Sequence, residues 1–211
     1  MGISTCCSSP GGSAPGSLLT GKQYALVSYL PDPLARFLDE LRLDLVPDCT
    51  PRAHVTILPP RPLRGEPKQA MKEIRQLGKR FHPFTLQLGD IELFAASNVV
   101  YIDIEGERNK LFEMYRTMNS GVLSYQEAYE YCPHITLAQR LAPDAAQKAF
   151  ETARCEWKAF TFSRCFRVER LHFVESDEGK CWRDLSETVL KAPPAYAEAT
   201  RRVPAAPLYR V

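Results

Sequence analysis

Two of the four histidines in this 211-residue sequence stand in the same short pattern: histidine, an apolar residue, threonine and a second apolar residue. The first copy begins at His54 with Thr56 behind it, and the second begins 80 positions later at His134 with Thr136. Two of four histidines would carry this pattern by chance only roughly a few times in a thousand. Imidazole titrates near neutral pH and a hydroxyl donates a hydrogen bond without carrying charge. The repeat therefore predicts a site for acid–base chemistry.

The spacing puts the two polar side chains of each copy on one face of a β-strand, because residues i and i+2 project to the same side. If the two strands face each other, one imidazole can be neutral while the other is protonated, so that a base and an acid meet one substrate. A phosphodiester suits this arrangement. The neutral histidine takes a proton from water, the protonated one gives a proton to the departing sugar oxygen, and the threonines donate to the non-bridging oxygens. This interpretation requires no metal and no other cofactor.

Strand-like and helix-like patterns alternate from residue 22 onward. Strands are expected at 24–30, 53–59, 84–94, 98–106, 134–138, 158–162, 165–175 and 180–185. Amphipathic helices are expected at 31–43, 66–81, 108–119 and 142–153. In both halves the motif strand precedes an amphipathic helix. The sequence therefore predicts a bilobal α+β fold with pseudo-twofold symmetry and a central cleft carrying both His-x-Thr strands.

The lobes are expected at about 22–104 and 105–190, with an exchange of strands between them left open. Residues 1–21, rich in Gly, Ser and Pro, and residues 191–211, rich in Pro and Ala, are expected to be tails outside the 22–190 domain. A formal net charge of +2 offers no broad surface for gripping long nucleic acid or an anionic membrane. No apolar run reaches the roughly 18 residues of a membrane span. The seven cysteines form no CxxC pair, which favours reduced thiols in a cytoplasmic protein, here expected to be a monomer.

These motifs resemble those of the two-histidine phosphoesterase superfamily, which includes the LigT-like enzymes called 2′-5′ RNA ligases. The likeness rests on the HVTI and HITL strands, their separation and the strand–helix order, and it covers about residues 22–190. It implies hydrolysis of 2′,3′-cyclic or 2′-5′ phosphodiesters without a metal. The residues matching His54 and His134 would be acid and base, and those matching Thr56 and Thr136 would bind the phosphate. The implied partner is an RNA terminus or a small nucleotide, with no membrane and no obligate protein partner.

The sequence departs from the family at one position. Many members carry a basic residue five positions after the second histidine, where this chain has Gln139 followed by Arg140. If the strand continues regularly, Arg140 shares the face of His134 and is predicted to contact the substrate phosphate. The first copy is expected to have no counterpart, because Pro59 and Pro60 should end its strand.

Two other interpretations stay open. The first is a non-catalytic module that binds an RNA end or a nucleotide in the same cleft, which would show binding without turnover. The second is a metal site that uses both histidines, for which Cys132 is the nearest further ligand. The remaining histidines, His82 and His172, are expected to be structural. The pseudo-symmetry also leaves open which of the paired histidines is the base.

Overall fold

The computed structural model describes residues 21–48, 52–177 and 181–192. The expected tails, 1–21 and 191–211, therefore lie almost wholly outside the described residues. Within the described part, no helix is both long enough and apolar enough to cross a lipid bilayer.

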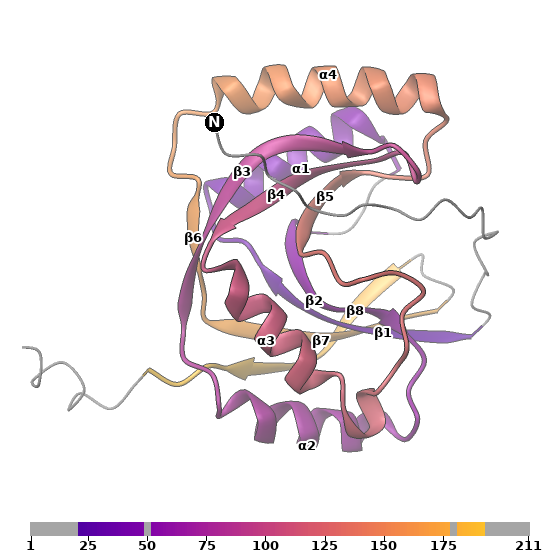
Figure 1. The fold of residues 1–211 in the computed structure, drawn as a ribbon, viewed down its shortest axis with the longest axis vertical. Coiled ribbons are helices and arrows are strands. Elements are labelled where there is room, and N and C mark those ends of the chain that lie inside the picture. Colours follow the sequence, from indigo (N-terminus) through magenta and orange to yellow (C-terminus); the bar gives the residue numbers. More distant parts are fainter. Residues whose placement is uncertain (1–20, 49–51, 178–180, 193–211) are drawn as a thin grey trace, which may run out of the picture.

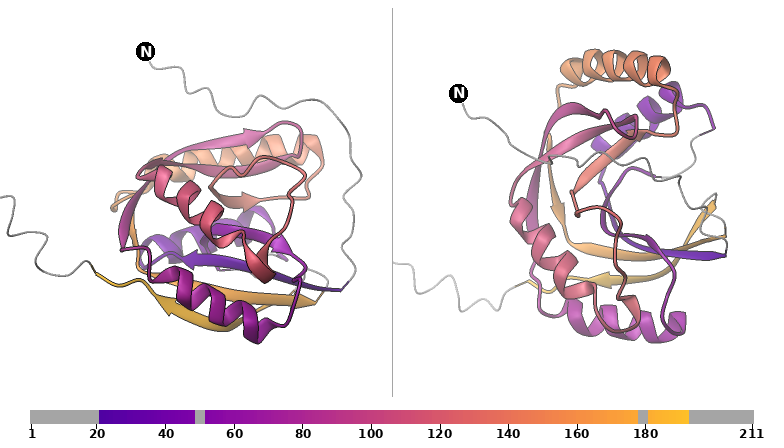
Figure 2. Two further views of the ribbon diagram at one scale, coloured as in Figure 1. Left: turned by 60° about the horizontal axis from the view of Figure 1, so that its bottom comes forward. Right: turned by 45° about the vertical axis from the view of Figure 1, so that its right-hand side comes forward.

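Two four-stranded antiparallel sheets form the framework, with strand orders β2-β1-β7-β8 and β5-β4-β3-β6. The strands are β1 Lys22–Tyr29, β2 His54–Arg61, β3 Phe84–Phe94, β4 Val99–Gly106, β5 His134–Ala138, β6 Cys165–Val168, β7 Arg170–Asp177 and β8 Cys181–Val189. The helices are α1 Leu34–Leu45, α2 Pro67–Gly78, α3 Arg108–Met118, the short 3₁₀ helix η1 Gly121–Leu123, and α4 Pro143–Ala159. The sheets curl toward one another, with α1 and α4 at one end of the molecule and α2 at the other (Figures 1 and 2).

The chain is built from two similar runs, β1-α1-β2-α2 and β4-α3-β5-α4. In each run the motif strand is the edge strand of its sheet and pairs antiparallel with the first strand of the run. The helix between the two strands crosses over: α1 packs against β5 and α3 packs against β2. The second helix stays with its own sheet, α2 against β8 and α4 against β3. This arrangement confirms the predicted α+β fold with duplicated lobes.

The lobes are not the two halves of the sequence. Strands β3 and β4 share a sheet with β5 and β6, while β7 and β8 return to pair beside β1 and β2. The expected boundary between 104 and 105 falls inside β4 and divides neither sheet from the other. Only Glu169 separates β6 from β7, so the chain passes from one sheet to the other within a single residue. Each sheet thus combines strands from both halves of the sequence.

The core follows the alternation of apolar residues along the strands. On β4, Val100, Ile102 and Ile104 are fully buried, whereas the residues between them are half-buried. On β2, Val55 and Ile57 are likewise fully buried. Each such side chain contributes about 1.5–3 kcal/mol when it leaves water. This burial fixes the register of the strands, because a slip of one residue would turn every apolar side chain outward.

Three expected elements were wrong. The stretch 165–175, expected as one strand, divides at Glu169 into β6 and β7, which lie in different sheets. Helix α4 continues to Ala159 and no strand forms at 158–162, because Trp157 extends the buried helical face and Phe160 stacks on it at 5.3 Å. Strand β2 does not stop at Pro59 and Pro60 but runs on to Arg61. Prolines are tolerated here because β2 is an edge strand, where one side of the backbone needs no ladder hydrogen bonds.

Candidate active site

The two His-x-Thr pairs lie at the beginning of two edge strands, β2 and β5, that come from different sheets and contact each other. His54 and Thr56 on β2 are half-buried, as are His134 and Thr136 on β5. The residues between them, Val55 and Ile135 in the two copies, are fully buried. The prediction that each histidine shares a strand face with its threonine is therefore confirmed.

Both imidazoles are held in the same way by the backbone two residues earlier. His54 Nδ1 lies 2.6 Å from the carbonyl oxygen of Arg52, and His134 Nδ1 lies 2.8 Å from that of Cys132. A carbonyl oxygen can only accept, so Nδ1 must carry the proton in each ring. In the neutral form this leaves the lone pair on Nε2. Each Nε2 can therefore accept a proton, or donate one once the ring is protonated.

The two histidines also interact electrostatically. Burial lowers the pKa of His54 to about 4. The hydrogen bond to the Arg52 carbonyl raises this pKa, whereas the positive charges of Arg42, His134 and Arg52 lower it further. Burial also lowers the pKa of His134 below its ordinary value of 6.5. The two rings are carried by β2 and β5, two strands that contact each other. Burial thus favours the neutral form of both imidazoles.

A cluster of side chains from β1, β7 and β8 holds Arg52, whose carbonyl orients His54. The Arg52 guanidinium lies 3.5 Å from the centre of the Tyr29 ring and 3.2 Å from Asp184 Oδ2. The Tyr29 hydroxyl donates to Asp184 Oδ1 at 2.6 Å. His172 packs against the Tyr29 ring with centroids 4.5 Å apart. The Arg52 backbone that fixes the His54 tautomer is thus attached through its side chain to the neighbouring strands.

On the other lobe, an aromatic pair lies beside His134. The rings of Phe94 and Tyr101 are stacked with centroids 3.9 Å apart. Both meet the His134 ring edge-on, at 5.4 and 5.2 Å. They cover one side of the imidazole and contribute to the burial that lowers its pKa.

An ion pair lies on the side of His134 where β4 pairs with β5. Arg108 Nη1 is 3.2 Å from Asp103 Oδ1, and Arg108 Nη2 is 3.5 Å from Cys132 Sγ. Asp103 is paired in register with His134 across β4 and β5, and its carboxylate raises the pKa of that imidazole against the effect of burial. Among the residues the structure describes, no group of three His, Cys, Asp or Glu side chains is placed to hold a metal ion.

Arg140 does not lie on the motif strand. Strand β5 ends at Ala138, and Arg140 is exposed with a φ of +61° in the left-handed region. The premise of a regular strand through residue 140 was wrong, because the chain has to turn away from the sheet before α4 begins at Pro143. The alternation of strand faces that placed Arg140 on the side of His134 therefore does not apply to it.

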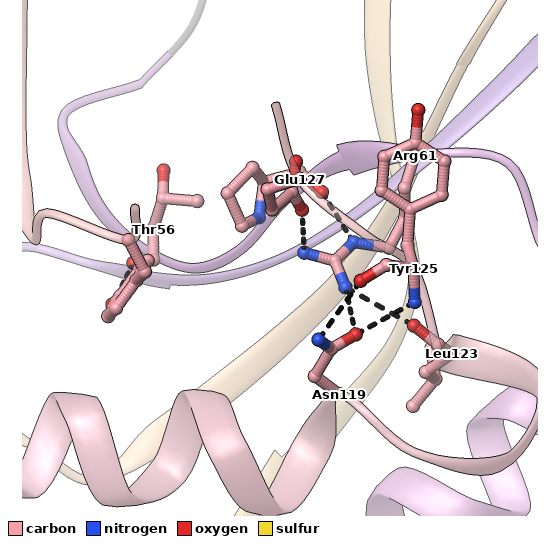
Figure 3. Close-up of polar contacts among 8 residues, drawn as sticks. Thr56, Arg61, Asn119, Leu123, Tyr125 and Glu127 are labelled. Carbon is pink, nitrogen blue, oxygen red and sulfur yellow. Dashed lines mark hydrogen bonds and ion pairs between the residues drawn. The ribbon is translucent and has the colours of Figure 1, made fainter. Parts of the chain in front are cut away.

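Sequence reasoning missed two residues that tie the lobes together, Arg61 and Tyr131. Arg61, at the end of β2, is only 1% exposed, and its guanidinium is bound by Glu127, Asn119 and the carbonyl of Leu123 (Figure 3). The Tyr131 hydroxyl donates to the backbone carbonyl of Thr56 at 2.7 Å. The available signal was an arginine closing an otherwise apolar strand, but nothing local identified its partners.

Comparison with known proteins assigns the chain to a family. The profile described as the 2′-5′ RNA ligase superfamily matches residues 30–180, which contain both motifs. The chain belongs to this superfamily. A presumptive phosphoesterase of Bacillus cytotoxicus is 28% identical over 138 residues, covering 61% of this chain and 77% of that protein. Another of Bacillus cereus strain B4264 is 27% identical over 131 residues, covering 61% of this chain and 73% of that protein.

Solved structures share the fold. TT0787 of Thermus thermophilus matches with a TM-score of 0.55 at 21% identity, covering 81% of this chain and 98% of that one. Escherichia coli LigT complexed with 3′-AMP matches with a TM-score of 0.52 at 17% identity and the same coverage. At these identities the likeness establishes the two-lobed architecture alone.

Proposed function

We propose that the protein is a metal-independent phosphodiesterase that hydrolyses 2′,3′-cyclic or 2′-5′ phosphodiesters at RNA ends or on nucleotides. The observation that carries the proposal is the pair of imidazoles on contacting edge strands, held in the same tautomer by matching backbone carbonyls. The superfamily and its presumptive phosphoesterases support this class of chemistry. Further support comes from E. coli LigT, a protein of this fold that has been crystallised with phosphate, with 3′-AMP and with NADP+.

In the proposed reaction, His54 is the base and His134 the acid. Burial favours the neutral form of both rings; the charges of Arg42 and Arg52 add to this at His54, whereas at His134 the Asp103 carboxylate favours the protonated form against burial and the charge of Arg108. His54 Nε2 takes a proton from water as the water oxygen bonds to phosphorus. The bond from phosphorus to the leaving oxygen then breaks, which is the 2′ or 3′ oxygen in a cyclic phosphate and the 5′ oxygen in a 2′-5′ linkage, and His134 Nε2 gives its proton to that oxygen.

The threonine hydroxyls complete the proposed site. Thr56 and Thr136 share strand faces with the two histidines, so their hydroxyls can donate to the non-bridging oxygens while charge gathers there. Arg140 has no strand to orient it and is not assigned to the phosphate. The site as proposed therefore comprises two imidazoles and two hydroxyls.

The test is incubation with nucleoside 2′,3′-cyclic phosphates and 2′-5′-linked dinucleotides in the presence of EDTA, with products resolved as 2′- or 3′-phosphates. Turnover in EDTA supports the proposal, and the position of the product phosphate identifies the bond that breaks. Saturable binding of these compounds without turnover would instead establish a nucleotide-binding module. Turnover that EDTA abolishes and Zn²⁺ restores would establish a metal site.

The pH dependence of kcat/KM should be bell-shaped, with its maximum below about pH 6.5, because kcat/KM reports the groups of the free enzyme. The rate should rise through the pKa of His54, about 4, as the base loses its proton. It should fall above the pKa of His134, which lies below 6.5, as the acid loses its proton. The apparent values belong to the coupled pair. A bound phosphate favours protonated imidazole, so the kcat profile should extend to higher pH; a kcat/KM maximum above about pH 8 would contradict these roles.

Replacing Thr56 or Thr136 with valine should lower kcat/KM by about 10- to 100-fold each, the usual loss for one hydrogen bond to a charged group. Valine keeps the β-branched shape that suits the strand, so folding should be unaffected. Steady-state kinetics on a cyclic phosphate measure the loss. Thr85→Val, at an exposed position on β3, is the matched control and should leave the rate unchanged. Wild-type kinetics in both motif variants would show that the threonine hydroxyls do not bind the phosphate.

A further inference from the structure

The connection between α3 and β5, residues 119–133, is attached to β2 at two points. This segment leads into the strand that carries His134, while β2 carries His54. It therefore lies between the two parts of the proposed site. Each attachment joins a residue of β2, the strand that carries His54, to the segment that precedes β5, the strand that carries His134.

The first attachment is the Tyr131 hydroxyl, which donates to the Thr56 carbonyl at 2.7 Å. This hydrogen bond joins the backbone of the edge strand β2 to the segment that leads into β5. The Tyr131 ring is itself fixed to α3: it stacks on Tyr115 with centroids 4.3 Å apart and meets Phe112 edge-on at 5.6 Å. The hydroxyl is therefore held in place by packing. Its contact lies two residues from His54, and its own backbone lies three residues from His134.

The second attachment is Arg61 at the far end of β2. Its Nη1 donates to Asn119 Oδ1 at 2.8 Å and to the Leu123 carbonyl at 3.2 Å, and its Nη2 pairs with Glu127. Asn119 also accepts a hydrogen bond from the Tyr125 backbone at 2.9 Å (Figure 3). Since the arginine is 1% exposed, it is closed to substrate. It holds the segment against β2.

We propose that Tyr131, with Arg61 behind it, is a positioning residue that sets the separation of the two His-x-Thr strands and so of the two imidazoles. Its consequence for turnover rests on the proposed function. Water attack and departure of the sugar oxygen occur on opposite sides of phosphorus, so each Nε2 must reach its own oxygen at hydrogen-bond distance. A displacement of about 1 Å is enough to cost about 100-fold in rate.

The test is Tyr131→Phe, which removes the hydroxyl and keeps the ring stacked on Tyr115. We expect kcat on a 2′,3′-cyclic phosphate to fall by about 10- to 100-fold while KM changes by less than about threefold. Tyr129→Phe makes the same change at a 71% exposed position of the same segment and should leave both constants unchanged. Glu127→Gln, which weakens the Arg61 attachment, should lower kcat in the same direction by a smaller factor. A purely structural role would shift the melting temperature and spare kcat.

A second measurement does not depend on turnover. NMR titration of the histidine ring protons should show that His134→Gln raises the pKa of His54, because a neighbouring positive charge is removed. In Tyr131→Phe that coupling should shrink, because the rings are free to separate. Unchanged kcat together with unchanged coupling in Tyr131→Phe would overturn the inference. If the wild type hydrolyses no phosphodiester but Tyr131→Phe still loses the coupling, the proposed function fails and the positioning role stands.

Discussion

Replacing either His54 or His134 with alanine is expected to lower kcat on a 2′,3′-cyclic phosphate by about 10²–10⁴-fold, the usual contribution of one general acid or base. Each side chain is only half-buried, and its ring is hydrogen-bonded to a backbone carbonyl, so the variants should stay folded. Single-turnover assays with resolved products measure the chemical step, and circular dichroism with thermal melts checks the fold.

The double variant gives a sharper result. If the base and the acid act in one step, removing the second histidine from a single variant should reduce kcat little further. The His54→Ala/His134→Ala protein should therefore be nearly as active as either single variant. His82→Ala is the control, because His82 bonds to the Lys191 carbonyl and lies on neither motif strand. A single variant that keeps activity within about threefold of wild type would exclude the acid–base pair.

Local patterns in the sequence predicted the parts of the site that depend on strand geometry. The two-residue period placed each histidine beside its threonine and sent Val55 and Ile135 into the core, as the structure has them. The same rule failed at Arg140, because it holds only while the strand continues, and β5 ends two residues earlier. A period identifies the face of a strand but does not identify where the strand stops.

Features that depend on contacts between distant residues could not be predicted. Whether β3 and β4 pair with β5 or with β1 is decided by tertiary packing, and each strand looks equally apolar in either sheet. The carbonyls of Arg52 and Cys132 that orient the imidazoles are backbone groups, which every residue possesses. For these reasons the pattern suggested the chemistry proposed for the site, left the strand exchange open and did not predict the tautomers.

Arg61→Ala is expected to lower the free energy of unfolding by about 3–5 kcal/mol, among the largest effects of any single change in this chain. The substitution leaves the mostly buried Glu127 carboxylate without its cation and removes a donor from both Asn119 and the Leu123 carbonyl. Urea denaturation measures the loss as a lower midpoint with an unchanged slope. Arg170→Ala is the matched control: its ion pair with Glu187 is exposed, so its loss should cost less than about 1 kcal/mol.

The double variant Arg61→Met/Glu127→Gln separates the charge from the packing. Methionine fills part of the arginine volume and glutamine carries no charge, so no unpaired ion stays buried, and the double variant should be more stable than Arg61→Ala. It should still be less active than wild type, because the segment that leads to His134 has lost its anchor on β2. If Arg61→Ala were no less stable than Arg170→Ala, the arginine would not be holding the two lobes together. Recovery of stability without recovery of kcat would show that the fold tolerates a looser connection between the motif strands than the chemistry does.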